Sequence, residues 1–281
     1  MPERLEAFIE RHPRLFVLTG AGCSTESGIP DYRDQKGDWK RKPPVMYASF
    51  MSDAQTRARY WARSLIGWPH FHAARPNDAH RALVALEQQG KIELLATQNV
   101  DRLHQLAGSH ETVDLHGRLD QVRCMSCNHR LPRAQLQLAL QQRNPRWCGL
   151  TAGSAPDGDA DLETMDFSDF VVPGCDQCGG ILKPDVVFFG ETVPPARVTR
   201  CMQALQTADA MLVFGSSLMV YSGYRFAQAA FAAGLPIAAV NLGITRADEL
   251  LTLKVQQSCS RALGFLLAAA PTVRLSERST Y

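Results

Sequence analysis

The sequence predicts an α/β protein whose core is a doubly wound, parallel, Rossmann-like sheet interrupted by two insertions. Short apolar runs typical of buried strands occur at residues 15–18, 92–96, 186–189, 211–214 and 237–240. Stretches with helical spacing of apolar residues separate these runs, and alternating strands and helices favour a parallel sheet. Leu5, Phe8 and Ile9 predict a first helix before the first strand.

Two stretches do not follow the alternation and predict insertions. Residues 35–76 carry three tryptophans among basic residues and predict a helical insertion, whereas residues 118–183 contain paired cysteines and a polar segment at 151–161. We therefore divide the chain into a Rossmann-like domain of residues 1–34, 77–117 and 184–270, a helical insertion of residues 35–76, a cysteine-bearing module of residues 118–183 with a flexible loop, and a tail of residues 271–281.

Composition indicates a globular protein without a strong surface field. The 281 residues are 45% hydrophobic, which fills a sizeable core, and the formal net charge is only +2. We expect neither nucleic acid nor a membrane as partner, because no apolar run approaches the roughly 20 residues that span a bilayer. The predicted first strand begins within about fifteen residues of Met1, so we expect a cytoplasmic protein, or a mitochondrial matrix protein if a leader has been removed.

Two Cys-x-x-Cys pairs predict a metal site. The pairs are Cys124 with Cys127 and Cys175 with Cys178, and together they offer the four soft ligands that tetrahedral zinc prefers. A closed set of four thiolates leaves no open position for water, so we expect one structural zinc ion per chain. A redox dithiol is the alternative, and Cys148 is a possible competing ligand.

A glycine-rich turn follows the first predicted strand. Gly20, Ala21 and Gly22 precede a predicted helix through residues 24–26, where backbone amides and a helix N-terminus can contact a pyrophosphate. Thr25 stands where the third glycine of the dinucleotide fingerprint falls, so a plain glycine turn remains an alternative.

Polar side chains follow the second predicted strand. Gln98, Asn99 and Asp101 offer two amides and a carboxylate at the sheet edge where doubly wound folds bind ligands. They can hold a carboxamide, or they can cap a helix over residues 100–106. His116 lies in an Asp-Leu-His-Gly segment, and such a histidine on its own is more often a packed or capping residue than a catalytic one.

The motifs GAGCSTESGIPDYR, TQNVDRLH, DLHG, KPDVVFFGE, VFGSSL and VNLG, in this order, resemble the signatures of the sirtuin family of NAD-dependent protein lysine deacylases. The resemblance covers nearly the whole chain. Finer segments, such as YWAR at residues 60–63 and TRAD at residues 245–248, are similar to the class II branch that includes mitochondrial sirtuin four. Cys23 departs from the family's usual isoleucine, and Asp114 from its common glutamate. Cys23 is expected to be a small buried hydrophobe, or else an oxidisable thiol near the cofactor.

The resemblance implies that NAD is consumed as co-substrate while an acylated lysine of a protein or peptide loses its acyl group. The products are then nicotinamide, free lysine and O-acyl-ADP-ribose. His116 is implied to take a proton from the ribose, assisted by Asn99. The implied NAD-binding residues are Gly20, Ala21, Gly22, Thr25, Asp31, Tyr32, Arg33, Gln98, Asn99, Asp101, His116, Gly215, Ser216, Ser217, Asn241, Leu242, Gly243 and Cys259.

The resemblance also implies where the substrate binds. Val187, Phe189 and Gly190 resemble the strand that pairs with the substrate peptide. Tyr60 and Arg63, one helical turn apart, match the pair that faces the distal end of the acyl chain, although a solvated basic helix face is the alternative. We therefore expect longer or branched acyl groups to be preferred over acetyl. Protein mono-ADP-ribosyl transfer or NAD hydrolysis is the rival activity, and a non-enzymatic NAD-sensing or zinc scaffold is the rival of another class.

Overall fold

The computed structural model describes residues 2–41, 44–151, 158, 160, 162 and 165–268. Its larger part is a six-stranded sheet in the order β3-β2-β1-β7-β8-β9, in which all neighbouring strands are parallel. The strands are β1 (Leu15–Thr19), β2 (Ile92–Thr97), β3 (Thr112–Asp114), β7 (Ala210–Phe214), β8 (Ile237–Val240) and β9 (Leu253–Val255). The predicted Rossmann-like fold class is confirmed.

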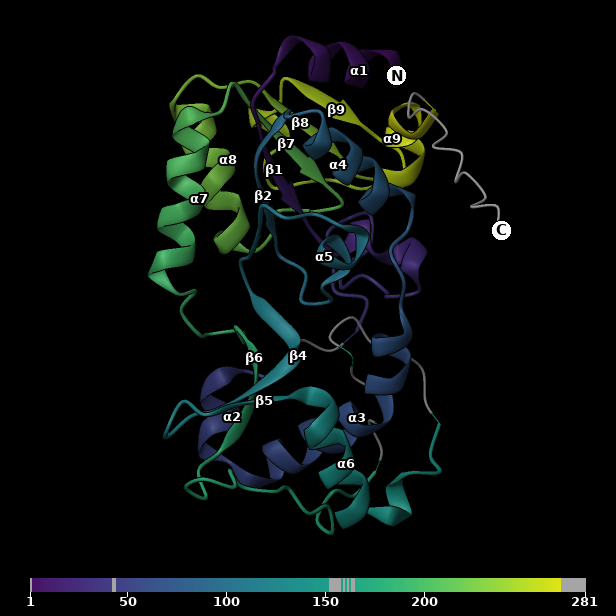
Figure 1. The fold of residues 1–281 in the computed structure, drawn as a ribbon, viewed down its shortest axis with the longest axis vertical. Helices are drawn as coiled ribbons and strands as arrows, with labels where there is room; N and C mark the ends of the chain where they lie inside the picture. Colours follow the sequence, from purple (N-terminus) through teal and green to yellow (C-terminus); the bar gives the residue numbers. More distant parts are fainter. Residues whose placement is uncertain are drawn as a thin grey trace, which may run out of the picture.

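Helices cover both faces of this sheet (Figure 1). One face carries α1 (Pro2–Arg11), α4 (Asp78–Gln88) and α9 (Cys259–Ala268), and the other carries α7 (Pro195–Thr207) and α8 (Tyr221–Ala232). Strand β1 shows how the sequence builds this arrangement, because its side chains alternate between faces. Leu15 and Val17 join the core with α1, α4 and α9, whereas Phe16 and Leu18 join the core with α7 and α8.

The smaller part lies at the other end of the molecule (Figure 1). It contains an antiparallel sheet in the order β5-β4-β6, made of β4 (Gly117–Cys124), β5 (Arg130–Pro132) and β6 (Leu182–Val186). Helices α2 (Tyr47–Ser52), α3 (Ala54–Ala73) and α6 (Arg133–Arg143) surround a third core cluster, in which Trp61 is fully buried. One further helix, α5 (Leu103–Ala107), follows β2. Short 3-10 turns occur at Ala21–Cys23, Thr25–Ser27, Pro145–Trp147 and Asp248–Leu250.

Three sequence-based expectations about local structure need correction. The run at residues 186–189 is not a strand of the parallel sheet, because β6 ends at Val186 and belongs to the small antiparallel sheet. The glycine turn leads into two 3-10 turns rather than an α-helix, since Gly28 in the left-handed region ends the second turn. Helix α5 begins at Leu103, later than the predicted residue 100. The three-residue strands β3 and β9 were not predicted.

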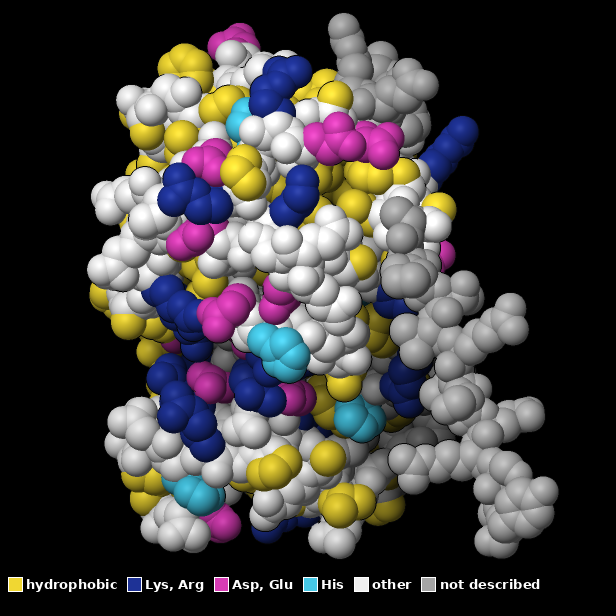
Figure 2. All heavy atoms as spheres, turned by 45° about the horizontal axis from the view of Figure 1, so that its top comes forward, with side chains coloured by type: hydrophobic (Ala, Val, Ile, Leu, Met, Phe, Trp, Pro, Cys, Tyr) yellow, Lys and Arg dark blue, Asp and Glu magenta, His cyan; other side chains and the backbone are white. Residues whose placement is uncertain are grey.

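The surface is mixed in charge on the face shown in Figure 2, where Lys and Arg side chains lie among Asp and Glu side chains. Within the described residues, no helix is both long and apolar enough to cross a membrane. The predicted tail and most of the predicted flexible loop at residues 151–161 lie outside the described residues.

Candidate active site

A cavity of about 300 Å³ opens at the carboxyl ends of β1, β2 and β7. This is the edge at which doubly wound sheets bind their ligands. All eighteen predicted NAD-site residues line it, and so do Tyr60, Val187 and Phe189 from the predicted substrate site. Arg63 and Gly190 are not among the described residues that line it.

The glycine turn packs tightly against the end of β7. A Cβ atom on Gly22 would lie 2.9 Å from the Cα atom of Gly215, and one on Gly20 would lie 2.8 Å from the Cβ atom of Ser216. The amides of Gly20 and Gly22 donate to the carbonyls of Phe214 and Gly215 at 2.9 and 2.8 Å. The two glycines are therefore required for close packing. The prediction that their amides are available to a pyrophosphate is wrong, because both amides already donate to the backbone.

Ala21 is consequently the residue of this turn whose amide has no hydrogen-bond partner within the described chain. Its amide is available to a phosphate oxygen, because Gly20 and Gly22 hold the turn in place on both sides.

A polar network links the turn after β2 to the turn after β1. The Nδ2 atom of Asn99 donates to the carbonyl of Gly20 at 3.1 Å and to the Ser24 hydroxyl at 3.0 Å. Ser24 in turn donates to Asp101 at 2.7 Å, and the other Asp101 oxygen accepts from the amide of Leu103 at 2.9 Å. Asp101 thus accepts from the first amide of α5, although the N-cap residue of that helix is Arg102, and burial raises the pKa of the Asp101 carboxyl.

His116 is held in one tautomer by its neighbours. Its Nδ1 atom lies 2.9 Å from the carbonyl of Gln98, which can only accept, so Nδ1 carries the proton. The Nε2 atom then accepts from the Ser222 hydroxyl at 2.7 Å. Burial lowers the pKa of His116 to about 4, so the imidazole is neutral at pH 7. A neutral imidazole whose Nε2 lone pair faces a hydroxyl can accept a proton from it, although a pKa of about 4 makes it a weaker base than a free imidazole.

Residues 31–40 form one wall of the cavity. The Arg33 guanidinium lies 3.9 Å from the centre of the Trp39 ring and donates to the carbonyl of Gly37 at 2.7 Å. Trp39 also contacts Phe189 edge to face, with ring centres 5.6 Å apart. Arg33 and Phe189 were both predicted as site residues. Trp39 contacts both of them and so links them in the structure.

The part of the cavity toward the small sheet is largely apolar. Tyr60 is almost fully buried, and its ring packs edge to face on Phe50 and at a tilt on Phe188. Arg63, one turn further along α3, donates from Nε to the carbonyl of Ala160 at 2.9 Å. The described residues that complete the apolar wall are Ile29, Phe71, Val100, Leu119, Val186 and Phe188.

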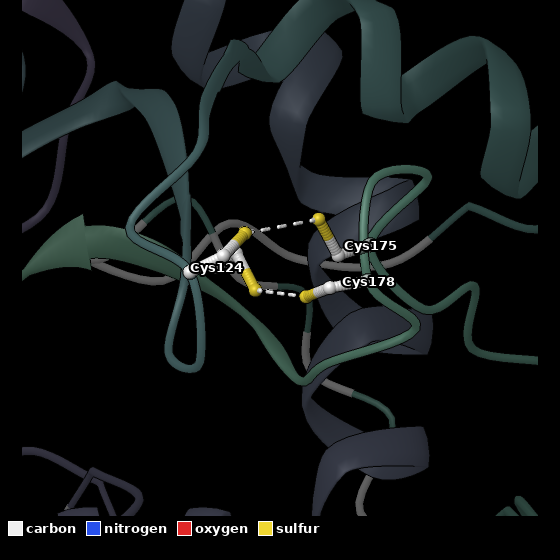
Figure 3. Close-up of side chains that lie close together, drawn as sticks. Cys124, Cys175 and Cys178 are labelled. Atoms are coloured by element: carbon white, nitrogen blue, oxygen red, sulfur yellow. Dashed lines mark hydrogen bonds between the residues drawn. The ribbon is translucent and has the colours of Figure 1, made fainter.

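The four paired cysteines meet at one point of the small part of the molecule. Their sulfur atoms lie within 4.8 Å of one another, with Cys124 to Cys178 at 3.5 Å and Cys127 to Cys175 at 3.8 Å. Figure 3 shows the side chains of the labelled cysteines turned toward one another. Four thiolates about 2.3 Å from a tetrahedral zinc ion are about 3.8 Å apart, so the set fits zinc.

Several functional contacts escaped the sequence analysis. Ser222 contacts His116, Ser24 contacts Asp101, and Trp39 stacks on Arg33. Ser24 lies in the GAGCSTESGIPDYR motif, but the sequence does not show which residue it contacts. Only the arrangement of distant segments reveals these partners.

Comparison with known proteins decides the family. The Sir2 family model matches residues 20–222 of the chain. The chain belongs to the Sir2 family. This sirtuin is 66% identical over 262 residues to an NAD-dependent protein deacetylase of Xanthomonas campestris, covering 93% of this chain and 89% of that protein. It is 49% identical over 267 residues to the human mitochondrial NAD-dependent protein lipoamidase sirtuin-4, covering 94% and 85%.

Solved sirtuin structures share the architecture. A structure of Sir2 with a p53 peptide and NAD⁺ superposes with a TM-score of 0.76 at 29% identity, covering 95% of this chain and 98% of that one. The sirtuin described here is therefore an NAD-dependent protein deacylase that takes peptide substrates, uses NAD as co-substrate and carries a structural zinc site.

Proposed function

We propose that this sirtuin removes longer or branched acyl groups from lysine side chains in preference to acetyl. The observation that carries the proposal is the apolar wall of the cavity between the His116 end and Tyr60. An acetyl group is too short to contact much of this wall, whereas a longer chain buries its methylene groups against it. The human relative is named a lipoamidase, which supports a preference for a longer acyl group.

The energetic argument concerns the transition state as well as binding. Each buried methylene contributes about 0.8 kcal/mol, or about fourfold in an equilibrium constant. If the contact persists in the transition state, kcat/KM rises by up to this factor for each added methylene until the chain reaches Tyr60.

We assign the proton transfer to His116. Its Nε2 atom carries the lone pair, and the backbone contact from Nδ1 to Gln98 fixes the ring direction. In this assignment the ribose hydroxyl replaces Ser222 as the donor to Nε2 and passes its proton to the imidazole. Asn99 and Asp101 position the nicotinamide end of NAD from the network that joins them to Ser24.

The substrate peptide is assigned to residues 187–190. The amide of Val187 donates to the carbonyl of His116 at 2.7 Å, which ties this segment to the catalytic residue. On the opposite side, the carbonyl of Phe189 accepts from the amide of Tyr47 at 2.8 Å. Gly190 follows with φ +80°, which turns the chain away after the assigned peptide-binding stretch.

Tyr60 and Arg63 are proposed to contact the acyl tail and to determine acyl selectivity. The structure supports the two residues unequally. Tyr60 lines the cavity, and on that ground we assign its side chain to the contact with the acyl tail. Arg63 donates to the Ala160 carbonyl and is not among the described residues that line the cavity, so its role stays a prediction. The mono-ADP-ribosyltransferase alternative has no specific support, since the relatives are named deacetylases and a lipoamidase.

The test is a panel of one lysine peptide carrying acetyl, butyryl, octanoyl, lipoyl, biotinyl or methylglutaryl groups. We expect kcat/KM to rise at least tenfold from acetyl to octanoyl or lipoyl. Equal or falling values with chain length would overturn the proposed preference while leaving the deacylase activity intact.

A further inference from the structure

A second cluster of metal-binding side chains lies beneath the glycine turn, apart from the four paired cysteines. It consists of Cys23 from the turn after β1, His80 from the first turn of α4, and His104 from α5. One ligand atom of each lies within 4.8 Å of those of the other two. The three side chains are only 1%, 0% and 1% exposed.

Two imidazole nitrogens in this cluster have no hydrogen-bond partner within the described chain. They are Nε2 of His80 and Nδ1 of His104, both fully buried. A buried polar atom without a partner costs free energy, so it indicates an unsatisfied ligand or donor position. The two rings are close, with centres 4.8 Å apart.

The opposite nitrogen of each ring has a hydrogen-bond partner, and for His104 this partner leaves the lone pair on Nδ1. Thr19 donates its hydroxyl proton to Thr97, so it accepts from Nε2 of His104 at 2.8 Å. For His80, Nδ1 lies 3.0 Å from the side-chain oxygen of Asn77 and 3.3 Å from the backbone amide of Asn77, which donates to it, so Nε2 becomes a ligand atom in the tautomer that carries the proton on Nδ1. Metal-binding histidines use their second nitrogen in this manner, which fixes the ring and its tautomer.

We propose that Cys23, His80 and His104 bind a thiophilic d¹⁰ cation, either Zn²⁺ or Cu⁺. One thiolate and two neutral imidazoles form a ligand set that both ions accept. Burial lowers the pKa of both histidines, whereas a hydrogen bond with Cys259 and burial raise the pKa of the Cys23 thiol, so the ion has to displace the proton of Cys23. Binding breaks the S–H bond of Cys23, and the proton leaves to solvent as the metal–sulfur bond forms.

The geometry is close to that of a bound ion. Ligand bonds of about 2.0 to 2.3 Å place ligand atoms up to roughly 3.8 Å apart, so the side chains need to move by about 1 Å at most. An ion at this point cross-links the glycine turn to α4 and α5. It should therefore raise the melting temperature, because a ligand that binds only the folded state stabilises it.

The test compares metal binding by the full-length zinc-loaded protein and its variants under anaerobic conditions. In one arm Co²⁺ replaces Zn²⁺ as a visible probe, and cobalt–thiolate absorption is recorded. In the other arm Cu⁺ is titrated against a coloured Cu⁺ chelator, and copper and zinc are counted in the same sample. The variants are Cys23→Val and Cys23→Ser, and the control is Cys201→Val, which alters an equally buried cysteine of α7 in the other core cluster.

In at least one arm, we expect wild type and Cys201→Val each to bind one more ion per chain than either Cys23 variant. We also expect that ion to raise the melting temperature of wild type and of Cys201→Val. The arm in which this difference occurs identifies the ion class. Equal metal content and equal melting temperatures in wild type and both Cys23 variants, with Co²⁺ and with Cu⁺, would overturn the proposal. Because no acyl substrate is used, the result is independent of the proposed acyl preference.

Discussion

The Nε2 atom of His116 lies 2.7 Å from the hydroxyl of Ser222, at the beginning of α8. Because the Gln98 carbonyl holds the proton on Nδ1, the Ser222 contact places a hydrogen-bond donor where the substrate hydroxyl is proposed to bind. The proposed base is therefore neutral and oriented before substrate arrives, so no proton has to be removed from it first.

Two histidines with a lowered pKa make stability depend on pH. The pKa of His116, and in the metal-free protein that of His80, is about 4 in the folded state, against about 6.5 in an unfolded chain. The unfolded state therefore binds more protons between these values, so stability is full above about pH 6.5 and falls as pH drops toward 4. Each histidine costs about 2 kcal/mol at pH 5 relative to pH 8.

Urea unfolding at pH 5, 6, 7 and 8 measures this effect. His116→Phe should remove one contribution, so its unfolding free energy should change less with pH than that of wild type. Parallel pH curves for the two proteins would mean that His116 titrates normally in the folded state.

Asp101 combines a hydrogen bond to the first amide of α5 with a proposed cofactor contact, and the two roles can be separated. Asp101→Asn keeps an oxygen for the Leu103 amide, whereas Asp101→Ala removes that hydrogen bond as well. We expect both variants to lose nicotinamide exchange and deacylation together, and only Asp101→Ala to lose about 1 kcal/mol of stability in addition. Exchange is followed with labelled nicotinamide, and full exchange activity in Asp101→Asn would remove the carboxylate from the pocket's chemistry.

The four paired cysteines should hold one zinc ion per chain beyond any metal at Cys23. A closed thiolate site contributes its binding energy to folding, so Cys175→Ser should lose solubility or melting temperature before it loses a specific chemical step. Cys148→Ser is the matched control, because Cys148 is exposed and lies outside the four. Metal analysis and thermal unfolding test this, and a metal-free, soluble and fully active Cys175→Ser protein would refute the structural role.

Tyr60 and Arg63 should differ in their effect on acyl selectivity. Tyr60→Phe removes only the hydroxyl from a ring that lines the cavity, so the ratio of kcat/KM for methylglutaryl and acetyl peptides should fall about three- to tenfold. Arg63→Met keeps bulk and removes charge, and its position predicts a smaller change. A larger effect at Arg63 than at Tyr60 would show that the guanidinium, not the phenol, contacts the tail.

Strong local patterns predicted most of the fold and the zinc site. The strand at residues 237–240 matches β8, and the four cysteines come together as their spacing indicated. Strands β3 and β9 escaped because three residues carry too little periodicity to distinguish them from a loop. The apolar run at residues 186–189 was wrongly predicted as a strand of the parallel sheet. Its side chains are apolar because they line the cavity and the core of the small part of the molecule.

The sequence also could not show which isolated residues meet. His80 and His104 lie 57 and 81 positions after Cys23, and nothing local marks them as partners. Likewise, the 106-residue separation between His116 and Ser222 hides their contact until the sheet brings the ends of its strands together.

The most direct test of the account is a stoichiometric assay with NAD and an octanoyl-lysine peptide. Nicotinamide release and the mass of the peptide are measured in the same reaction for wild type and His116→Ala. We predict one nicotinamide released for each acyl group lost in wild type, no deacylation in His116→Ala, and NAD affinity within about tenfold of wild type in that variant. Nicotinamide release without loss of the acyl group, or a peptide that gains the mass of ADP-ribose, would contradict the account.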